Sequence, residues 1–247
     1  MEKKDFITII SINNPEVKNA IDGKSAEELA NALREFEEDK ESKVAILCGK
    51  GGNFCSGANL KALQNGTGNK VQETGDGPMG PTRMILTKPV IGALSGYAVA
   101  GGMELALLCD LRIAEKNTIM GIFNRRWGIP LIDGGTIRLP RLIGLGRALD
   151  LILTGRPIDA DEALSFGLVN RIVEIGQSRA EAEKLAEQIA NFPQICLQHD
   201  RLSAYEQYDY NFEDALKNEY NHGLKSLSEV QDGLHRFNKG EGRHGKF

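Results

Sequence analysis

The chain has few cysteines and histidines, and their placement argues against two kinds of site. It contains four of each in 247 residues. The cysteines are Cys48, Cys55, Cys109 and Cys196, and the histidines are His199, His222, His235 and His244. No Cys-x-x-Cys pair occurs and no two histidines are four residues apart, so we expect reduced thiols and no metal site.

Long apolar runs and an excess of one charge are also missing. No run approaches the length of a membrane-spanning helix, and the N-terminal residues 1–5 lack the apolar core of a signal peptide. The net charge is -4, from 30 basic and 34 acidic residues, and no basic patch alternates with aromatics. We therefore expect a cytoplasmic protein that binds neither membranes nor nucleic acid.

Short apolar or β-rich stretches alternate with helical patterns along most of the chain. Strands are predicted over residues 6–12, 44–48, 90–94 and 111–114. Helices are predicted to begin after residues 101, 134, 146 and 159, and a capping box at Ser25–Glu28 is predicted to start another that continues to Phe36. This alternation is typical of an α/β fold with crossover connections.

Two regions depart from that alternation. Residues 64–81 carry several glycines and prolines, which predicts a mobile loop that either lines a pocket or is a plain surface insertion. Beyond residue 177 only helical patterns occur. The length suits one sizeable domain with an appended piece, so we expect an α/β core over 1–192 and a helical module over 193–247.

Two segments each join a predicted strand to a glycine-rich loop. The first runs from Val44 through Gly57-Ala58, and the second runs from Val90 through Gly101-Gly102 into an apolar helix bearing Glu104 on its first turn. Taken singly, such loops also serve as tight turns. Together they can supply two backbone N–H donors to an oxyanion, which indicates acyl chemistry.

These loops and several other motifs resemble the enoyl-CoA hydratase/isomerase (crotonase) superfamily. The matching segments, in family order, are 14–20, 54–60, 100–106, 134–144, 153–156 and 160–169. The resemblance extends to about Val173 and is specific only in combination. It implies a crotonase-like ββα spiral core, an acyl-CoA thioester as substrate, no cofactor beyond that coenzyme A, and C-terminal helices that assemble a homotrimer or a dimer of trimers.

The resemblance also implies roles for particular residues. Backbone N–H groups of Ala58 and Gly101 would bind the thioester oxygen, and Glu104 would be the first catalytic glutamate. Residues implied to contact the substrate are Lys18, Ala20, Ser56, Gly57, Asn59, Leu60, Gly102, Asn124 and Trp127. Asn59 stands where the family commonly has aspartate and keeps its ability to start a helix.

The second glutamate of the hydratase pattern is not present. Its position is taken by Asn124, which can form hydrogen bonds but cannot exchange a proton as a carboxylate does. The nearest replacement is Asp133, whose place resembles that of the single acidic residue of some isomerase members. Asp133 is also suited to cap the following helix, and Arg125 or Arg126 is available to pair with it or to remain solvated.

Four functions follow from these residues. Hydration of 2-enoyl-CoA is the leading hypothesis, with double-bond isomerisation or another enolate reaction as the alternative. A binding protein that holds acyl-CoA without turnover is a third. A serine hydrolase is disfavoured because Ser56 and Ser95 have no histidine before His199, and Cys55 likewise lacks a nearby base and is expected to be a packed thiol.

Overall fold

The computed structural model describes residues 1–241 and divides the chain into two compact units, Met1–Ala186 and Glu187–Phe247. The division falls within helix α7 (Ser178–Ala190), a few residues before the boundary expected at 192/193. Residues 242–247 of the expected helical module, including His244, lie outside the described residues.

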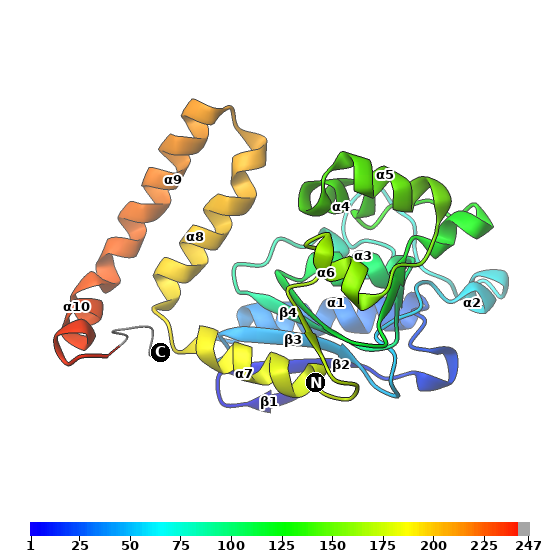
Figure 1. Cartoon of the computed structure of the whole chain (residues 1–247), viewed down its shortest axis with the longest axis horizontal. Helices are drawn as coiled ribbons and strands as arrows, with labels where there is room; N and C mark the ends of the chain where they lie inside the picture. Colours follow the sequence, from blue (N-terminus) through cyan, green and yellow to red (C-terminus); the bar gives the residue numbers. More distant parts are fainter. Residues whose placement is uncertain (242–247) are drawn as a thin grey trace. The chain divides into compact units, whose positions relative to one another are not determined.

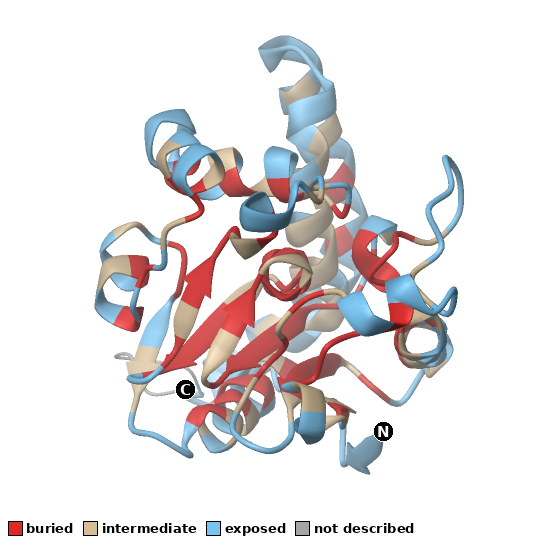
Figure 2. Cartoon of the chain, turned by 90° about the vertical axis from the view of Figure 1, so that its right-hand side faces the viewer, coloured by how far each residue is buried: buried red, intermediate tan, exposed pale blue. Residues whose placement is uncertain are grey.

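The first unit is built on a mostly parallel sheet (Figure 1). Its strand order in the described chain is β1-β2-β3-β4-β6-β8; β1 is antiparallel to β2 and the other neighbours are parallel. The strands are β1 Glu2–Lys4, β2 Ile7–Ile12, β3 Val44–Gly49, β4 Val90–Leu94, β6 Leu111–Glu115 and β8 Arg171–Val173. The four predicted strands are therefore confirmed, and Figure 2 shows how completely the central ones are buried.

Helices cover this sheet and connect its strands. The α-helices of the first unit are α1 Gly23–Glu38, α2 Leu60–Gln64, α3 Gly101–Leu108, α4 Gly135–Ile143, α5 Leu145–Thr154 and α6 Ala160–Ser165, followed by the start of α7. Three single-turn helices are η1 Pro15–Val17, η2 Pro81–Arg83 and η3 Phe123–Trp127. The mixed α/β architecture agrees with the expected fold class.

Helix α1 begins earlier than its sequence pattern predicted. The N-cap residue is Asp22, whose side chain accepts a hydrogen bond from the Ser25 N–H at 2.8 Å, so the predicted capping box at Ser25 is wrong. Because Asp22 already supplies the acceptor that the first turn needs, Ser25 lies inside the helix. The buried face then follows helical spacing through Leu29, Leu33 and Phe36, as predicted.

The topology brings the two glycine-rich loops to one edge of the sheet. Strands β3 and β4 are parallel neighbours, so the loops that follow them leave from the same side. A short strand, β5 (Tyr97–Val99), pairs with β7 (Ile119–Gly121) in a second small sheet and leads into α3. The first loop adds to β5 through Cys55, whose N–H donates to Tyr97 O at 2.8 Å and whose carbonyl accepts from the Val99 N–H at 3.1 Å.

The second unit is helical throughout its described part. It contains the end of α7, then α8 Gln194–Glu206, α9 Phe212–Ser226 and α10 Val230–Asn238, with short turns η4 Gln207–Asp209 and η5 Leu227–Glu229. Helices α8 and α9 pack against each other, yet large apolar side chains such as Phe212 (81% exposed) and Tyr220 remain on the surface. None of the helices in residues 1–241 is both long and apolar enough to cross a bilayer.

Candidate active site

The loops that carry Ala58 and Gly101 are in direct contact. Gly57 has a φ of +96°, and a Cβ atom built there would lie 2.9 Å from Ala100 Cβ and 3.1 Å from Gly101 N. Ala100, in turn, has a φ of +53°, which is unusual for a residue with a side chain. Glycine at position 57 therefore allows the two backbones to approach closely.

Both predicted oxyanion donors are on the wall of a single cavity of about 420 Å³. Gly101 is the first residue of α3, so its N–H has no partner inside the helix. Within the described residues, neither the Ala58 N–H nor the Gly101 N–H donates to another protein group. Two backbone donors therefore remain available to a ligand in this cavity.

Five of the nine residues predicted to contact the substrate line the same cavity, together with the predicted oxyanion donors and carboxyl residues. They are Lys18, Ser56, Ala58, Leu60, Gly101, Glu104, Asn124, Trp127 and Asp133. Asn69, Val71, Pro78 and Met79 from the irregular segment 64–81 also line it, which favours the pocket-wall interpretation of that segment. The remaining wall is largely apolar and includes Tyr97, Phe123, Ile129 and Ile132.

Four of the predicted contact residues are not on the cavity wall. Ala20 is buried, and Gly57 lies behind Ala58 where the two loops touch. Asn59 caps α2 by accepting from the Lys61 and Ala62 N–H groups, which confirms its helix-starting role. A Cβ at Gly102 would collide with the Cys55 carbonyl oxygen, so this glycine permits the close packing of α3 on the first loop.

Glu104 is the buried carboxylate of the site, with only 3% of its surface exposed. Its Oε1 atom accepts hydrogen bonds from the Gly135 N–H at 2.8 Å and from the Asp133 N–H at 3.0 Å. Glu104 therefore satisfies the first N–H group of α4, although it belongs to α3. These two bonds hold the carboxylate at the cavity wall.

Asp133 lies next to Glu104 but does not cap α4. The N-cap residue is Gly134, and the Asp133 side chain turns instead toward the segment preceding β4. Its Oδ1 atom accepts from the Met79 N–H at 2.9 Å and from the Thr82 hydroxyl. The predicted capping role of Asp133 is therefore wrong, because Glu104 already occupies the helix terminus.

Burial raises the pKa of both carboxyl groups, and the charge of Asp133 adds to the effect on Glu104. Burial, followed by the nearby charge of Asp133, raises the pKa of Glu104 to about 7. Burial also raises the pKa of Asp133, while its hydrogen bonds from Thr82 and Met79 act in the opposite direction. A carboxyl group with a pKa near 7 is suited to exchange protons at neutral pH.

The raised pKa of Glu104 predicts a pH-dependent effect on stability. The folded state retains a proton that the unfolded chain loses near its ordinary pKa of 4.5, so stability decreases as pH rises from 4.5 through about 7, by roughly 3 kcal/mol. Glutamine at this position avoids burying a charge and can still accept both N–H groups. We expect Glu104→Gln to raise the melting temperature more at pH 8 than at pH 4.5, measured by circular dichroism. An equal change at both pH values would contradict this.

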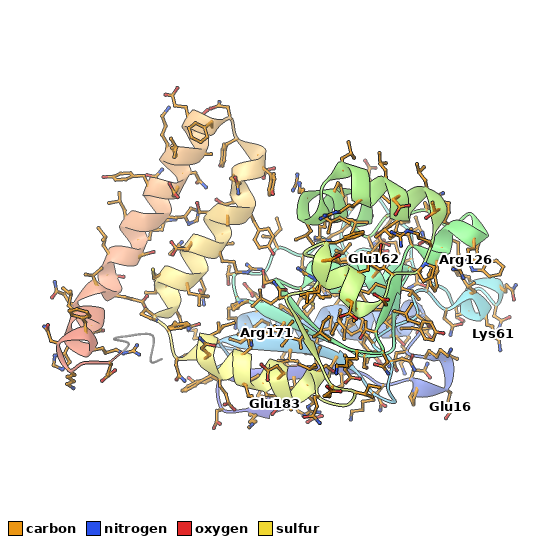
Figure 3. The ribbon with its side chains drawn as sticks, in the orientation of Figure 1. Glu16, Lys61, Arg126, Glu162, Arg171 and Glu183 are labelled. Atoms are coloured by element: carbon orange, nitrogen blue, oxygen red, sulfur yellow. The ribbon has the colours of Figure 1, made fainter. Side chains whose placement is uncertain are left out.

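Asn124 is buried on η3, and a single hydrogen bond orients its side-chain amide. Its Nδ2 donates to Ile129 O at 2.8 Å, while Oδ1 has no partner among the described residues. The neighbouring Arg125 and Arg126 donate to the carbonyls of Ile152 and Gly155 rather than pairing with Asp133, and Arg126 lies at the outer edge of the unit (Figure 3).

Several other expectations concern thiols, serine and tryptophan. Cys55 is completely buried, which raises the pKa of its thiol to about 12 and supports the packed-thiol interpretation. The Ser56 hydroxyl donates to Val17 O at 3.1 Å.

Trp127, one of the predicted contact residues, is 68% exposed. No group of three or more metal-ligating side chains occurs in residues 1–241.

Two residues of the site were not predicted from the sequence. Thr82 bonds to Asp133 from 51 residues away, and Tyr97 lines the cavity with the Lys18 ammonium 4.3 Å from its ring centroid. Thr82 follows a Gly-Pro turn and has no motif that distinguishes it from an ordinary loop threonine. Tyr97 lies within the second glycine-rich segment, so its strand position beside the first loop was the available signal.

Comparison with known proteins identifies the family. A family model described as enoyl-CoA hydratase/isomerase matches residues 2–244. The chain is 35% identical over 209 residues to a crotonyl-CoA hydratase of Syntrophomonas wolfei, covering 83% of this chain and 80% of the relative. It is 36% identical over 196 residues to a short-chain-enoyl-CoA hydratase of Clostridium acetobutylicum, covering 77% and 74% respectively.

Solved structures agree with this assignment. An enoyl-CoA hydratase from Mycobacterium tuberculosis superposes with a TM-score of 0.91 at 34% identity, covering 96% of this chain and 94% of that one. A second, from Mycobacterium marinum, gives a TM-score of 0.91 at 32% identity with the same coverage. The expected crotonase-like fold is thereby confirmed, and the chain belongs to the enoyl-CoA hydratase/isomerase family.

Proposed function

We propose that the protein hydrates 2-enoyl-CoA thioesters. The observation that carries the proposal is the convergence of two unpaired backbone N–H groups, from Ala58 and Gly101, on a cavity that also contains the carboxyl groups of Glu104 and Asp133. Relatives named as enoyl-CoA and crotonyl-CoA hydratases support the same reaction. An acyl-CoA substrate suits the largely apolar wall.

The chemistry assigns a task to each group. Water adds its oxygen to Cβ of the enoyl thioester, and Cα gains a proton, so the double bond is consumed. As the new C–O bond forms, negative charge develops on the thioester oxygen, where the N–H groups of Ala58 and Gly101 stabilise it. Glu104 and Asp133 exchange the two protons of the reaction with the water and with Cα. No cofactor is required beyond the coenzyme A that the substrate carries.

The rest of the cavity is assigned to substrate binding. Lys18, whose ammonium lies over the Tyr97 ring, would meet the negatively charged coenzyme A portion, as would backbone groups near Ala20. Ser56 and Leu60 flank the oxyanion loop and would contact the pantetheine arm. Trp127 and its apolar neighbours would enclose the acyl chain.

Isomerisation of a 3-enoyl-CoA is the second candidate. By the family resemblance, Asn124 takes the place of the second glutamate, and Asp133 has the place of the single acidic residue of some isomerase members. A single carboxylate can move a proton between Cα and Cγ without water, provided that the same oxyanion donors stabilise the enolate. The two reactions therefore differ in whether one carboxyl group or two exchange protons with the substrate.

An absorbance assay separates the candidate functions. We expect trans-2-enoyl-CoA to lose the absorbance of its conjugated thioester when the protein is added. No loss, with 3-enoyl-CoA becoming conjugated instead, would favour isomerisation. Tight binding of acyl-CoA without change in either substrate would favour a non-catalytic binding protein, and reaction of a serine with a phosphonate probe would favour a hydrolase.

Asp133→Asn tests whether the second carboxyl group takes part. The asparagine oxygen can still accept from Met79 and Thr82, so the local structure is expected to persist, whereas proton transfer at this position is lost. We expect the hydration kcat to fall about 100-fold with little change in KM. Unchanged turnover would remove Asp133 from the mechanism.

The assembly and location of the protein belong to the same proposal. Exposed apolar side chains on the helices of the second unit support contacts with further copies, as a homotrimer or a dimer of trimers. Light scattering coupled to size-exclusion chromatography measures this directly. A cytoplasmic location is also proposed, although relatives include a protein named as mitochondrial in Dictyostelium discoideum and one named as peroxisomal in Arabidopsis thaliana.

A further inference from the structure

Thr82 is buried against the candidate active site without being on the cavity wall. Only 1% of its surface is exposed, and its hydroxyl donates to Asp133 Oδ1. The Met79 N–H donates to the same oxygen at 2.9 Å. Two donors from one short segment therefore converge on one oxygen of Asp133, and both favour its ionised form.

The segment around Gly77 is closely fitted to this pair of side chains. A Cβ at Gly77 would collide with Thr82 Oγ1 and lie 2.6 Å from Asp133 Oδ1. Gly77 and Gly80 exchange two backbone hydrogen bonds, which form a tight turn immediately before Thr82. The turn thus places both donors, and a glycine at position 77 leaves room for the hydroxyl to reach the carboxylate.

Arg138 connects the two residues a second time. Its Nη2 donates to Thr82 O at 2.8 Å and its Nη1 donates to Asp133 O at 3.2 Å. The guanidinium therefore spans the backbone carbonyls on both sides of the Thr82–Asp133 hydrogen bond. The positive charges of Arg83 and Arg138 both favour the ionised form of Asp133.

We propose that Thr82 is a positioning residue that holds Asp133 as the ionised base of the site and thereby leaves Glu104 as the acid. This rests on the proposed hydration. Asp133 takes a proton from water as the water oxygen bonds to Cβ, and Glu104 gives its proton to Cα. Asp133 ends protonated and Glu104 ionised, and exchange with solvent restores both for the next turnover.

The electrostatics of the pair agree with this division of roles. The charge of Asp133 is the second largest cause, after burial, of the raised pKa of Glu104. An ionised Asp133 therefore favours the protonated form of Glu104, and loss of the Thr82 hydrogen bond weakens both the ionisation of Asp133 and this effect on Glu104. When two neighbouring carboxyl groups have environments that separate their pKa values, one can act as acid and the other as base.

Thr82→Val and Thr82→Ser test the proposal through the pH profile of hydration. Valine keeps the shape of threonine without the hydroxyl, whereas serine keeps the hydroxyl. We expect Thr82→Val to move the acidic limb of the kcat/KM profile to higher pH by about one unit or more and to lower kcat about 10- to 100-fold, with KM nearly unchanged. Thr82→Ser is expected to restore both. Equal losses in the two variants, or an unmoved profile in Thr82→Val, would overturn the proposal.

A second measurement does not depend on turnover. The titration of Asp133 can be followed by carboxyl-carbon NMR of aspartate-labelled protein, with Asp133→Asn identifying its signal. We expect the midpoint to move upward in Thr82→Val and to stay near the wild-type value in Thr82→Ser. An unmoved midpoint in Thr82→Val overturns the role of Thr82. Failure of the wild-type protein to hydrate enoyl-CoA overturns the proposed function instead, so the two failures are distinguishable.

Discussion

Replacing Glu104 by glutamine is expected to lower kcat for the hydration reaction by about 10³- to 10⁴-fold. The carboxyl group has a pKa of about 7 and lies on the wall of the cavity that contains both oxyanion donors. Glutamine can accept the same hydrogen bonds from Asp133 and Gly135, but it cannot transfer a proton. Stopped-flow absorbance of the conjugated thioester measures the loss.

Glu115→Gln is a matched control for that variant. Glu115 is also buried in the first unit, where it accepts from the Ser178 hydroxyl at 2.8 Å, but it does not line the cavity. We expect it to leave kcat nearly unchanged. Calorimetry should show that Glu104→Gln still binds an acyl-CoA product. Retention of most of the activity in Glu104→Gln would remove proton transfer at this position from the mechanism.

Gly57→Ala is expected to lower kcat about 100- to 1000-fold by separating the two oxyanion loops. The new methyl group would meet Ala100 Cβ at 2.9 Å and Gly101 N at 3.1 Å, so the loops must move apart. Displacement of one backbone donor from an oxyanion typically costs this much in rate. The effect should fall mainly on kcat, because negative charge on the thioester oxygen develops in the transition state.

Gly52→Ala separates this steric effect from backbone strain. Gly52 has a φ of +76° in the same loop, but a Cβ there meets nothing within 4 Å. Alanine at a positive φ costs about 1 kcal/mol at either position, which denaturant unfolding measures. We expect Gly57→Ala to lose more stability than Gly52→Ala, because the steric contact adds to the backbone strain, and only Gly57→Ala to lose activity. A comparable loss of kcat in both would attribute the effect to loop strain and not to the contact with Gly101.

Much of the fold was predicted correctly because strands and helices depend largely on residues that are close together in the sequence. The strands over 44–48 and 90–94 are continuous apolar runs, as buried parallel strands require, and they were predicted correctly. The start of α1 was misplaced because Asp22 and Ser25 are both good capping residues, and sequence alone does not show which one the chain uses.

The side-chain contacts in the site, in contrast, could not be predicted from local patterns. Asp133 was predicted to cap the helix that follows it, yet its partner is Thr82, 51 residues earlier. The helix terminus is instead satisfied by Glu104, 31 residues before Gly135. Each of these contacts joins segments on different elements, so neither follows from spacing along the chain.

The sequence by itself determined four of the strands, the alternation of strands and helices, the two glycine-rich loops and a carboxylate on the first turn of α3, because turn chemistry and hydrophobic periodicity are local properties. Only the tertiary structure decided that Ala58 and Gly101 share a cavity and that Thr82 holds Asp133 beside Glu104. The reason is physical. Hydrogen bonds and charge interactions between distant segments depend on how buried elements pack, and the pKa of a carboxyl group depends on that packing.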